Sequence, residues 1–411
     1  MSDERIIEAL EGGNKWWKEK FSTEYKDREI YAEIKKFLKE RQIIALVGLR
    51  RTGKTTIMLK IVEDSLPHLD KINIIYFSFD EFKGTRISEV IKAYSRLMNR
   101  DTGKGRYLFL FDEIQKVEDW EEQLKRIYDE SPNFKIIISG SESLFIRQMS
   151  RESLAGRIYE FQIKTLNLRE YLAFRNKKFE NINLYKEEIL REFRGFLLCC
   201  GFPEMINKST DISEKYMKEN VIEKVIYRDI PQILPIKDPT LLDHLLKIII
   251  QDPGETINLD ELSKDIGVAR QTISIYLDYL EKSFLIKKLY NYSKNARKTQ
   301  RSLKKYYPAI IPPSISGRRD LFGKVFETFI VNQLDAEFFW RDPYKNEVDI
   351  IKTSPLKAIE VKSGAIKERD IYPIRKFIDK FHPREALIIS YSTEDTLGKI
   401  KIIPFYKYLL E

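Results

Sequence analysis

Runs of apolar residues alternate with segments of helical spacing along the N-terminal part of the chain. The apolar runs are 42–47, 72–79, 107–111 and 134–138. Each is dominated by aliphatic or aromatic residues, which is typical of strands buried on both faces of a parallel sheet. The segments 56–62 and 87–98, which lie between runs, have apolar residues at helical spacing. This alternation predicts an α/β fold built on a parallel sheet.

A glycine-rich turn joins the first run to the helical segment after it. Residues 48–55 read G-L-R-R-T-G-K-T, the spacing of a phosphate-binding P-loop. Glycine lets backbone N–H groups approach a phosphate, and the helix N-terminus adds a favourable dipole. Lys54 is expected to reach the β- and γ-phosphates of ATP, and the Thr55 hydroxyl to bind Mg²⁺. The predicted nucleotide-binding residues are Gly48, Leu49, Arg50, Arg51, Thr52, Gly53, Lys54, Thr55 and Thr56.

Polar residues follow the third and fourth apolar runs. After 107–111 come Asp112 and Glu113, a Walker B arrangement in which the aspartate holds Mg²⁺ and the glutamate polarises the attacking water. The fourth run ends in Ser139 and Ser141; Ser139 is the preferred contact for the γ-phosphate or the water. Because another strand precedes the Walker B strand, the pattern predicts the additional-strand class of P-loop NTPases.

Composition excludes several classes of protein. The 411 residues suffice for about two to four domains. No apolar run approaches the ~18 residues of a membrane span, and the acidic N-terminus is unlike a secretory signal. We therefore expect a cytoplasmic protein without a membrane partner. The adjacent Cys199 and Cys200 and three scattered histidines give no zinc-ligand spacing.

The positive charge of the chain is concentrated in one segment. Its net charge of +9 is small against 72 basic and 63 acidic residues, but the segment 294–305 contains no acidic residue. Its basic residues are Lys294, Arg297, Lys298, Arg301, Lys304 and Lys305. Such a run suits a surface that contacts the phosphates of DNA, and it suits a solvated linker equally well.

The segment 240–290 predicts three helices and a wing. The expected helices are 241–250, 259–266 and 269–283. A short helix, a turn at Gly267 and a longer helix follow the pattern of a helix-turn-helix. Arg270, Gln271 and Ser274 lie off the apolar stripe of the last helix and would be available to a DNA groove. Winged helices also serve as protein-docking modules, so both kinds of partner stay open.

Two alternating segments near the C-terminus predict a hairpin that gathers carboxylates. They are 347–352 and 357–362, with a loop between them. If the loop closes a hairpin, Lys352 faces Lys357 and, by counting back, Asp349 faces Glu360. Opposed residues lie roughly 5 Å apart, and Lys362 shares their face because the strand period is two.

Glu327, on a helix upstream, completes a quartet with Asp349, Glu360 and Lys362. The quartet matches the PD-(D/E)xK nuclease pattern, here as E…D…ExK. Asp349 and Glu360 would hold a second Mg²⁺ or Mn²⁺, and Lys362 would act on water or phosphate. The alternatives are an ordinary surface hairpin and a nuclease-like fold that only binds.

Nearly the whole chain resembles the prokaryotic AAA+ ATPases, abundant in archaea, that carry a C-terminal domain of unknown function with a restriction-endonuclease-like fold. The resemblance rests on segments 47–56, 112–120, 138–141 and 153–157. It implies that Arg157 reaches a γ-phosphate, in cis or across a subunit interface, with Arg151 as the other candidate. A surface ion pair is the alternative for Arg157. It also implies a helical lid reached through the turn 201–204.

The sequence thus predicts a four-part α/β chain. The parts are an N-terminal helix with an AAA+-like P-loop core at 1–180, a helical lid at 181–237, a winged helix at 238–300 and a PD-(D/E)xK nuclease-like domain at 301–411. The expected function is Mg²⁺-dependent ATP hydrolysis coupled to DNA binding or processing, with a homo-oligomer or protein partner. The alternative is a nucleotide-gated switch or scaffold that binds protein and has an inactive nuclease-like domain.

Overall fold

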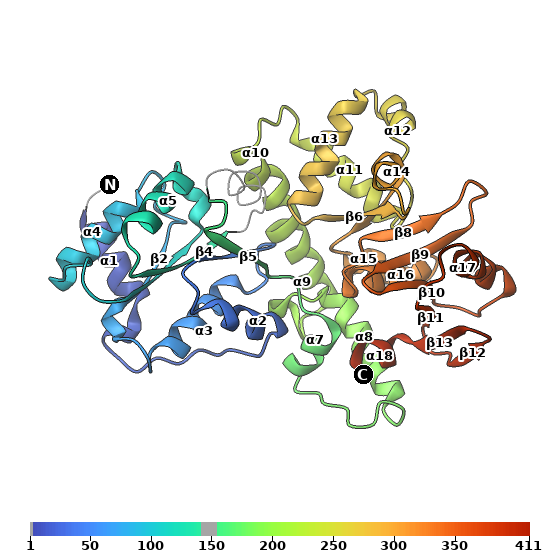
Figure 1. Ribbon diagram of the computed structural model, residues 1–411, viewed down its shortest axis with the longest axis horizontal. Helices are drawn as coiled ribbons and strands as arrows, with labels where there is room; N and C mark the ends of the chain where they lie inside the picture. Colours follow the sequence, from blue (N-terminus) through green and yellow to red (C-terminus); the bar gives the residue numbers. More distant parts are fainter. Residues whose placement is uncertain (1–2, 141–153) are drawn as a thin grey trace. The chain divides into compact units, whose positions relative to one another are not determined.

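The computed structural model describes residues 3–140 and 154–411 (Figure 1). Ser141 and Arg151, the second choices for the phosphate contact and the arginine, lie outside these residues. The chain forms two compact units, 1–165 and 166–411. No helix of the described residues is long and apolar enough to cross a membrane.

The first unit is built on a five-stranded parallel sheet with the order β2-β3-β4-β1-β5. Its strands are β1 Ile43–Val47, β2 Ile74–Ser78, β3 Tyr107–Asp112, β4 Phe134–Gly140 and β5 Ile158–Gln162. Every residue of β1 and β3 is buried, as their continuous apolar runs predict. Because β4 separates β1 from β3, the sheet has the additional strand expected between the two motif strands.

Helices cover this sheet and protect its edge. They are α1 Asp3–Gly13, α2 Glu29–Phe37, α3 Lys54–Ser65, α4 Ile87–Met98 and α5 Trp120–Glu130. At the edge strand β2, the Asn14 side chain bonds to the backbone N–H and C=O of Tyr76 at 2.7 and 2.8 Å. The Trp16 and Trp17 indoles donate to Ile74 O at 3.0 and 2.9 Å. The N-terminal segment therefore satisfies backbone groups that an open edge would expose.

The second unit begins with helices. They are α7 Leu168–Phe174, α8 Lys186–Cys199, α9 Thr210–Lys215, α10 Ile230–Ile233, α11 Pro239–Gln251, α12 Leu259–Ile266 and α13 Arg270–Lys282. The last three correspond closely to the helices expected in 240–290. Since Tyr171 of α7 packs edge-on against Phe196 of α8, α7 belongs to this unit. The contacts therefore divide the chain at 165/166 and not at 180/181.

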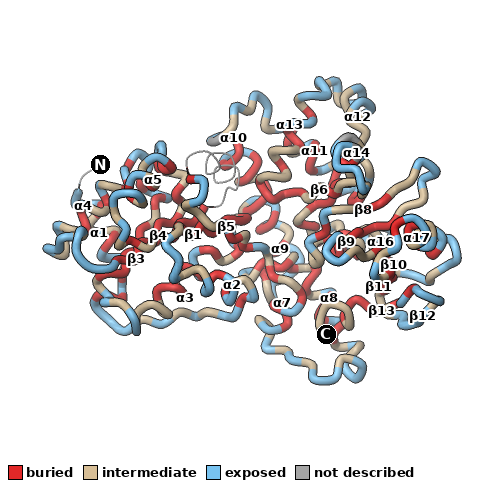
Figure 2. Tube along the Cα trace, viewed as in Figure 1, coloured by how far each residue is buried: buried red, intermediate tan, exposed pale blue. Residues whose placement is uncertain are grey.

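An eight-stranded mixed sheet forms the rest of the second unit, in the order β12-β13-β11-β10-β9-β8-β6-β7. The strands are β6 Ile286–Asn291, β7 Lys304–Pro308, β8 Phe338–Arg341, β9 Glu347–Thr353, β10 Leu356–Lys362, β11 Glu385–Ser390, β12 Asp395–Leu397 and β13 Ile400–Pro404. Its helices are α14 Ala296–Arg301, α15 Pro313–Ser316, α16 Phe322–Gln333, α17 Glu368–Phe381 and α18 Phe405–Leu410. Buried residues follow the strands of both sheets (Figure 2).

The expected boundary at residue 300 runs through this sheet. β6 pairs with β7 on one side and, through Tyr290 and Phe338, with β8 on the other. The core continues across the same strands, because Trp340 of β8 packs against Phe377 of α17 with ring centroids 5.4 Å apart. The strands expected as a wing are thus part of the C-terminal sheet.

Candidate functional site

The P-loop runs from the end of β1 into α3, and its glycines have backbone roles. Gly48 has φ +148°, and a Cβ there would lie 2.2 Å from Ile163 O, so a larger residue does not fit. Gly53 precedes α3 in the left-handed region at φ +95°. The Lys54 ammonium donates to Gly48 O at 3.0 Å and Leu49 O at 2.8 Å. The Lys54 ammonium therefore lies against the P-loop, where a bound phosphate is expected.

Arg28 braces the P-loop, a contact that the sequence analysis missed. Its buried guanidinium donates to Thr52 O at 2.9 Å and to Lys164 O at 2.7 Å, just beyond β5. It reaches the loop from a segment before α2, more than twenty residues upstream in sequence. No local pattern marks an arginine that acts over such a separation.

Asp112, at the end of β3, accepts hydrogen bonds from three hydroxyl groups. Its Oδ2 accepts from Thr55 Oγ1 at 2.6 Å and Tyr76 OH at 2.9 Å, while its Oδ1 accepts from Ser139 Oγ. The structure thus gathers Thr55, Asp112 and Ser139 as expected, and adds Tyr76 from β2. Burial, followed by the Asp112 charge, raises the pKa of Tyr76 above its ordinary value, so the phenol stays a donor. A carboxylate and hydroxyl oxygens suit Mg²⁺.

Glu113 lies beside this group in a left-handed backbone conformation, with φ +53°. Burial raises the pKa of its carboxyl above the ordinary value, and the Lys54 charge opposes that shift. Gln115 donates a short hydrogen bond to Glu113 Oε2. The base predicted from sequence therefore lies in a largely desolvated position with a neighbouring amide that fixes its orientation.

Arg157 does not come to the P-loop within the chain. It precedes β5, and its backbone O accepts from Ile43 N at the start of β1, whereas the P-loop follows the end of β1. Its guanidinium pairs with Asp129 through Nε at 3.0 Å and Nη2 at 3.1 Å. The expected action in cis is wrong, because Arg157 and the P-loop lie at opposite ends of parallel strands. Action across a subunit interface stays a prediction.

The C-terminal hairpin forms with the expected register. Lys352 of β9 pairs with Lys357 of β10, and the pairing continues to Ile350 and Ile359. Asp349 and Glu360 are the next residues along the two strands. The loop is shorter than expected, because the strands extend by one further pair. Both carboxylates are buried, and Lys362 Nζ lies 2.9 Å from Glu360 Oε1. The structure therefore brings Asp349, Glu360 and Lys362 together.

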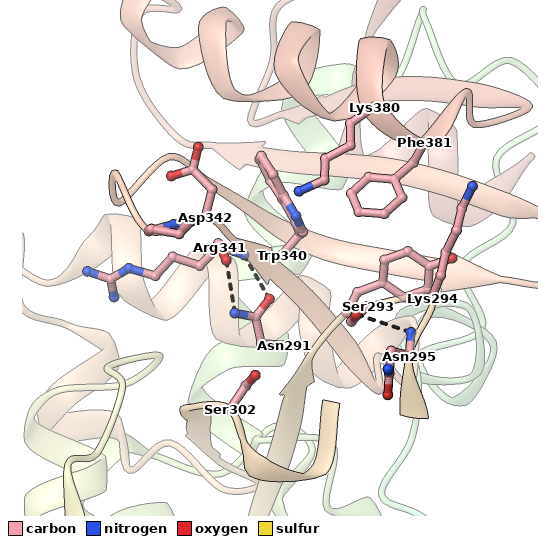
Figure 3. Close-up of a pocket in the computed structure, with 12 residues that line it drawn as sticks. Asn291, Ser293, Lys294, Asn295, Ser302, Trp340, Arg341, Asp342, Lys380 and Phe381 are labelled. Atoms are coloured by element: carbon pink, nitrogen blue, oxygen red, sulfur yellow. Dashed lines mark hydrogen bonds between the residues drawn. The ribbon is translucent and has the colours of Figure 1, made fainter. Parts of the chain in front are cut away.

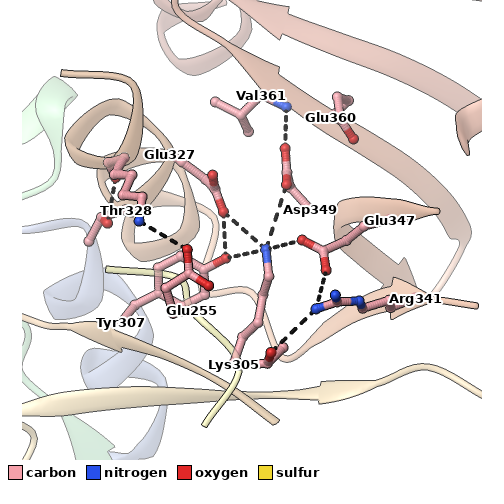
Figure 4. A network of polar contacts seen from close by, with 12 residues as sticks. Glu255, Lys305, Tyr307, Glu327, Thr328, Arg341, Glu347, Asp349, Glu360 and Val361 are labelled. Carbon is pink, nitrogen blue, oxygen red and sulfur yellow. Dashed lines mark hydrogen bonds and ion pairs between the residues drawn. The ribbon is translucent and has the colours of Figure 1, made fainter. Parts of the chain in front are cut away.

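Lys305 lies at the centre of these carboxylates (Figure 4). Its ammonium is 3.3 Å from Glu327 Oε1, 2.5 Å from Glu347 Oε1 and 3.8 Å from Asp349 Oδ1. Tyr307 OH donates to Glu327 Oε1 at 2.6 Å. Lys305 was expected on a phosphate-contacting surface, but β7 turns it inward and it is only 4% exposed. That expectation is wrong for Lys305.

Burial and mutual repulsion shape the charges of this carboxylate cluster, which comprises Glu327, Glu347, Asp349 and Glu360. Burial and then the Glu327 charge raise the pKa of Asp349, and burial and then Asp349 raise the pKa of Glu360. For Lys305, burial lowers the pKa, but the surrounding carboxylates outweigh it and hold the pKa well above its ordinary value. The ammonium is therefore charged at neutral pH.

The cluster does not fit the second metal site expected at Asp349 and Glu360. One oxygen favours an ion, since Glu360 Oε2 is buried and meets no donor among the described residues. Asp349, however, uses Oδ2 to accept from Val361 N at 2.9 Å and faces Lys305 with Oδ1. Within residues 3–140 and 154–411, no three His, Cys, Asp or Glu side chains are arranged to hold a metal.

A pocket of about 330 Å³ lies beside the segment that follows β6 (Figure 3). The charged residues that line it are Lys294, Lys380, Asp342 and Arg341, and the Arg341 guanidinium pairs with Glu347. The Lys380 and Lys294 ammonium groups lie 5.3 and 5.9 Å from the Phe381 ring centre. The Asn291 amide holds the Arg341 main chain through two 2.9 Å hydrogen bonds. The pocket thus combines positive charge with aromatic rings.

The last helix of the predicted helix-turn-helix has the expected faces. Along α13, Arg270, Gln271 and Ser274 are exposed. Ile273 and Leu277 are buried on the opposite side. Arg270 Nε is 3.4 Å from Asp260 Oδ1 of α12, an exposed pair of little energetic weight.

Two family models match parts of the chain. A family model for an AAA domain matches residues 40–172, and one for a domain of unknown function, DUF8612, matches residues 190–309. An uncharacterized protein of Methanocaldococcus jannaschii is 25% identical, over 90% of this chain and 85% of that protein. One from Haemophilus influenzae is 23% identical, over 93% of this chain and 92% of that protein.

Among solved structures, Cdc6p from Pyrobaculum aerophilum is 10% identical, with a TM-score of 0.30 over 75% of this chain and 97% of that chain. The AAA match covers the P-loop, Asp112 and Ser139, which the structure brings together. The two relatives of this chain named above come from an archaeon and a bacterium. Residues 40–172, which contain the P-loop and Asp112, are therefore similar to AAA domains.

Proposed function

We propose that the first unit binds Mg²⁺·ATP at the P-loop and hydrolyses its γ-phosphate. The observation that carries this proposal is the 2.6 Å contact between Thr55 Oγ1 and Asp112 Oδ2. These two groups come from separate elements, α3 and β3, and are the pair that holds Mg²⁺ in a P-loop site. Their convergence next to Lys54 supports the nucleotide site over a chance glycine turn.

Each side chain has a distinct task in this site. Lys54, which now donates to two loop carbonyls, exchanges them for phosphate oxygens. Thr55 and Asp112 hold Mg²⁺, which neutralises phosphate charge. Glu113 orients the attacking water and accepts its proton. Ser139 and Tyr76 fix the Asp112 carboxylate through their hydroxyl groups. Because these donors are neutral, Asp112 keeps its charge for the ion.

The second unit is proposed to bind DNA under the control of the nucleotide. Residues between α11 and α12 pair with β7 through Thr256 and Lys305, and β6 pairs with the other edge of β7. Three helices beside these paired strands, which continue into the eight-stranded sheet, support a winged-helix-like arrangement, whose α13 leaves polar side chains exposed. The cationic pocket near Lys294 supports a contact with phosphate.

The carboxylate cluster favours binding over cleavage in the second unit. The Lys305 ammonium already faces three of its carboxylates. Asp349 has a partner at each oxygen, with Oδ1 facing Lys305 and Oδ2 accepting from Val361 N. The nuclease-like role expected for Glu327, Asp349, Glu360 and Lys362 therefore has less support than the ATPase role. Protein docking by α13, and a homo-oligomer in which Arg157 reaches a neighbouring nucleotide, stay alternatives for the partner.

An ATPase assay with and without DNA tests this proposal. We expect Mg²⁺-dependent phosphate release that changes when single- or double-stranded DNA is added, with no nicking of that DNA. A chain that hydrolyses ATP but ignores DNA would favour the protein-docking alternative. A chain that neither binds nor hydrolyses ATP would contradict the proposal at its centre.

A further inference from the structure

The carboxylate cluster concentrates negative charge in a buried place. The exposed fractions of its side chains are 20% for Glu327, 25% for Glu347, 9% for Asp349 and 6% for Glu360. A buried ionised carboxylate without a partner is strongly unfavourable, so the members of the cluster that stay ionised need compensating positive charge in the folded state. In PD-(D/E)xK sites part of that charge would come from a divalent ion.

Here the chain supplies the cations itself. Lys362 pairs with Glu360, and Arg341 Nη1 lies 3.6 Å from Glu347 Oε2. Among the residues that the structure describes, Lys305 alone is within 4 Å of three members, Glu327, Glu347 and Asp349. An ion bound by Asp349 would have to lie close to this ammonium, and like charges repel strongly at such range in a poorly solvated site.

The fold also fixes where Lys305 points. β7 is paired on both edges, with β6 on one side and with 254–257 on the other, where Gly254 N donates to Tyr306 O at 2.9 Å. Lys305 and Tyr307 share the inward face, and both contact Glu327. A Cβ at Gly254 would lie 2.8 Å from the Tyr307 ring and 3.1 Å from Glu327 Oε1. This packing leaves the strand no freedom to turn the lysine outward.

We propose that Lys305 is the permanent cation of the carboxylate cluster, so that the second unit holds these carboxylates together without a divalent ion. The lysine is not a member of the E…D…ExK quartet. Its ammonium offsets the negative charge of the carboxylates, as a divalent ion would in a metal-binding site. It follows that removing Lys305 should leave a site that gains from Mg²⁺ or Mn²⁺, whereas the natural chain should not respond.

Hydrogen–deuterium exchange of the nucleotide-free full-length chain tests this, read on peptides that cover β9 and β10. In the natural chain we expect the same exchange with and without millimolar Mg²⁺ or Mn²⁺. Lys305→Met should speed exchange in these peptides by about a hundredfold, since it leaves buried carboxylates uncompensated. Added Mn²⁺ should then restore most of the lost protection in the variant.

Lys304→Met is the matched control. Lys304 precedes Lys305 in β7, but its ammonium donates to Gln300 O at 3.0 Å and faces away from the cluster. Its substitution should leave both exchange and metal response unchanged. If Lys305→Met does not fold, the double variant Lys305→Met/Glu327→Gln, which removes a negative charge together with the lysine, should recover the fold.

Two results would overturn the proposal. One is divalent-dependent protection of β9 and β10 in the natural chain, which would mean that the cluster binds an ion with Lys305 in place. The other is a Lys305→Met variant with natural exchange and no response to Mn²⁺, which would mean that the cluster needs no cation at this position. The first result can be obtained without any variant.

Discussion

The two units each bring a lysine close to carboxylates that other elements supply, with opposite electrostatic outcomes. In the first, Lys54 donates to carbonyl groups of its own loop, and Asp112 is held by neutral hydroxyl groups. In the second, the Lys305 ammonium faces three carboxylates directly. In the first unit the ammonium and the carboxylate both stay available to a ligand. In the second unit the ammonium and the carboxylates pair with one another.

The comparison teaches that residue types alone do not define a metal site. Asp112 is the last residue of β3 and Asp349 lies near the start of β9, and both belong to motifs that predict Mg²⁺. What separates them is the neighbour: a hydroxyl group can share its carboxylate with an ion, but an ammonium competes with one. Five substitutions test the two units, in order of decreasing expected effect.

The largest effect is expected for Glu113→Gln, which removes the base but keeps its shape. Loss of general-base catalysis should lower the rate of ATP hydrolysis by about 10²- to 10⁴-fold, while ATP still binds. Phosphate release and calorimetry measure the two quantities separately. Glu122→Gln, at an exposed position of α5, is the control and should match the natural chain. Undiminished hydrolysis by Glu113→Gln would mean that another residue activates the water.

Lys54→Ala should come next, because the phosphates lose their P-loop cation. We expect ATP affinity to fall by about a hundredfold, the usual scale for truncating one partner of a buried charge pair. Lys60→Ala, on the same helix but paired with Glu63 and Asp64, is a suitable control for calorimetry. Lys305→Met should also leave ATP affinity unchanged. Loss of ATP affinity in Lys60→Ala or Lys305→Met would contradict the claim that Lys54 is the lysine that binds the phosphates.

Tyr76→Phe tests the hydroxyl group that the sequence analysis missed. Removal of this donor from Asp112 should raise the Mg²⁺ concentration needed for half-maximal hydrolysis by about tenfold, as for other groups that orient a metal ligand. The maximal rate at saturating Mg²⁺ should change much less. An unchanged Mg²⁺ requirement would show that Thr55 and Ser139 suffice to hold the carboxylate.

The smallest effect is expected at the cationic pocket. Lys294→Ala and Lys380→Ala should each lower the salt dependence of DNA binding by about one slope unit, if each lysine contacts one phosphate. Fluorescence anisotropy over a range of salt concentrations gives the slope. Lys399→Ala, an exposed lysine outside the pocket, should leave the slope as it is. Slopes equal to that of the natural chain for all three variants would mean that the lysines of the pocket contact no phosphate.

The sequence predicted features that depend on neighbouring residues in the chain. The buried strands, the P-loop and the three helices of 240–290 follow from local periodicity and from glycine at defined positions. The hairpin register followed as well, because a strand period of two links Lys352 with Lys357 and then Asp349 with Glu360. These are consequences of backbone geometry, which short segments encode.

Features that depend on which segments pair in space were missed. Lys305 looked like one of six basic residues in a linker, and nothing local says that 304–308 becomes a strand enclosed on both edges. Arg28 and Tyr76 act on the P-loop site from separate elements. Arg157 was misjudged because only the parallel pairing of β5 with β1 shows which end of the sheet it occupies.

The central claim is that the P-loop holds a divalent ion with nucleotide and the carboxylate cluster holds none. Counting bound Mn²⁺ by electron paramagnetic resonance, with and without a non-hydrolysable ATP analogue, tests it most directly. The account predicts one Mn²⁺ per chain that requires the analogue, is lost in Asp112→Asn and persists in Asp349→Asn. A second Mn²⁺ that binds without the analogue and disappears in Asp349→Asn would contradict it.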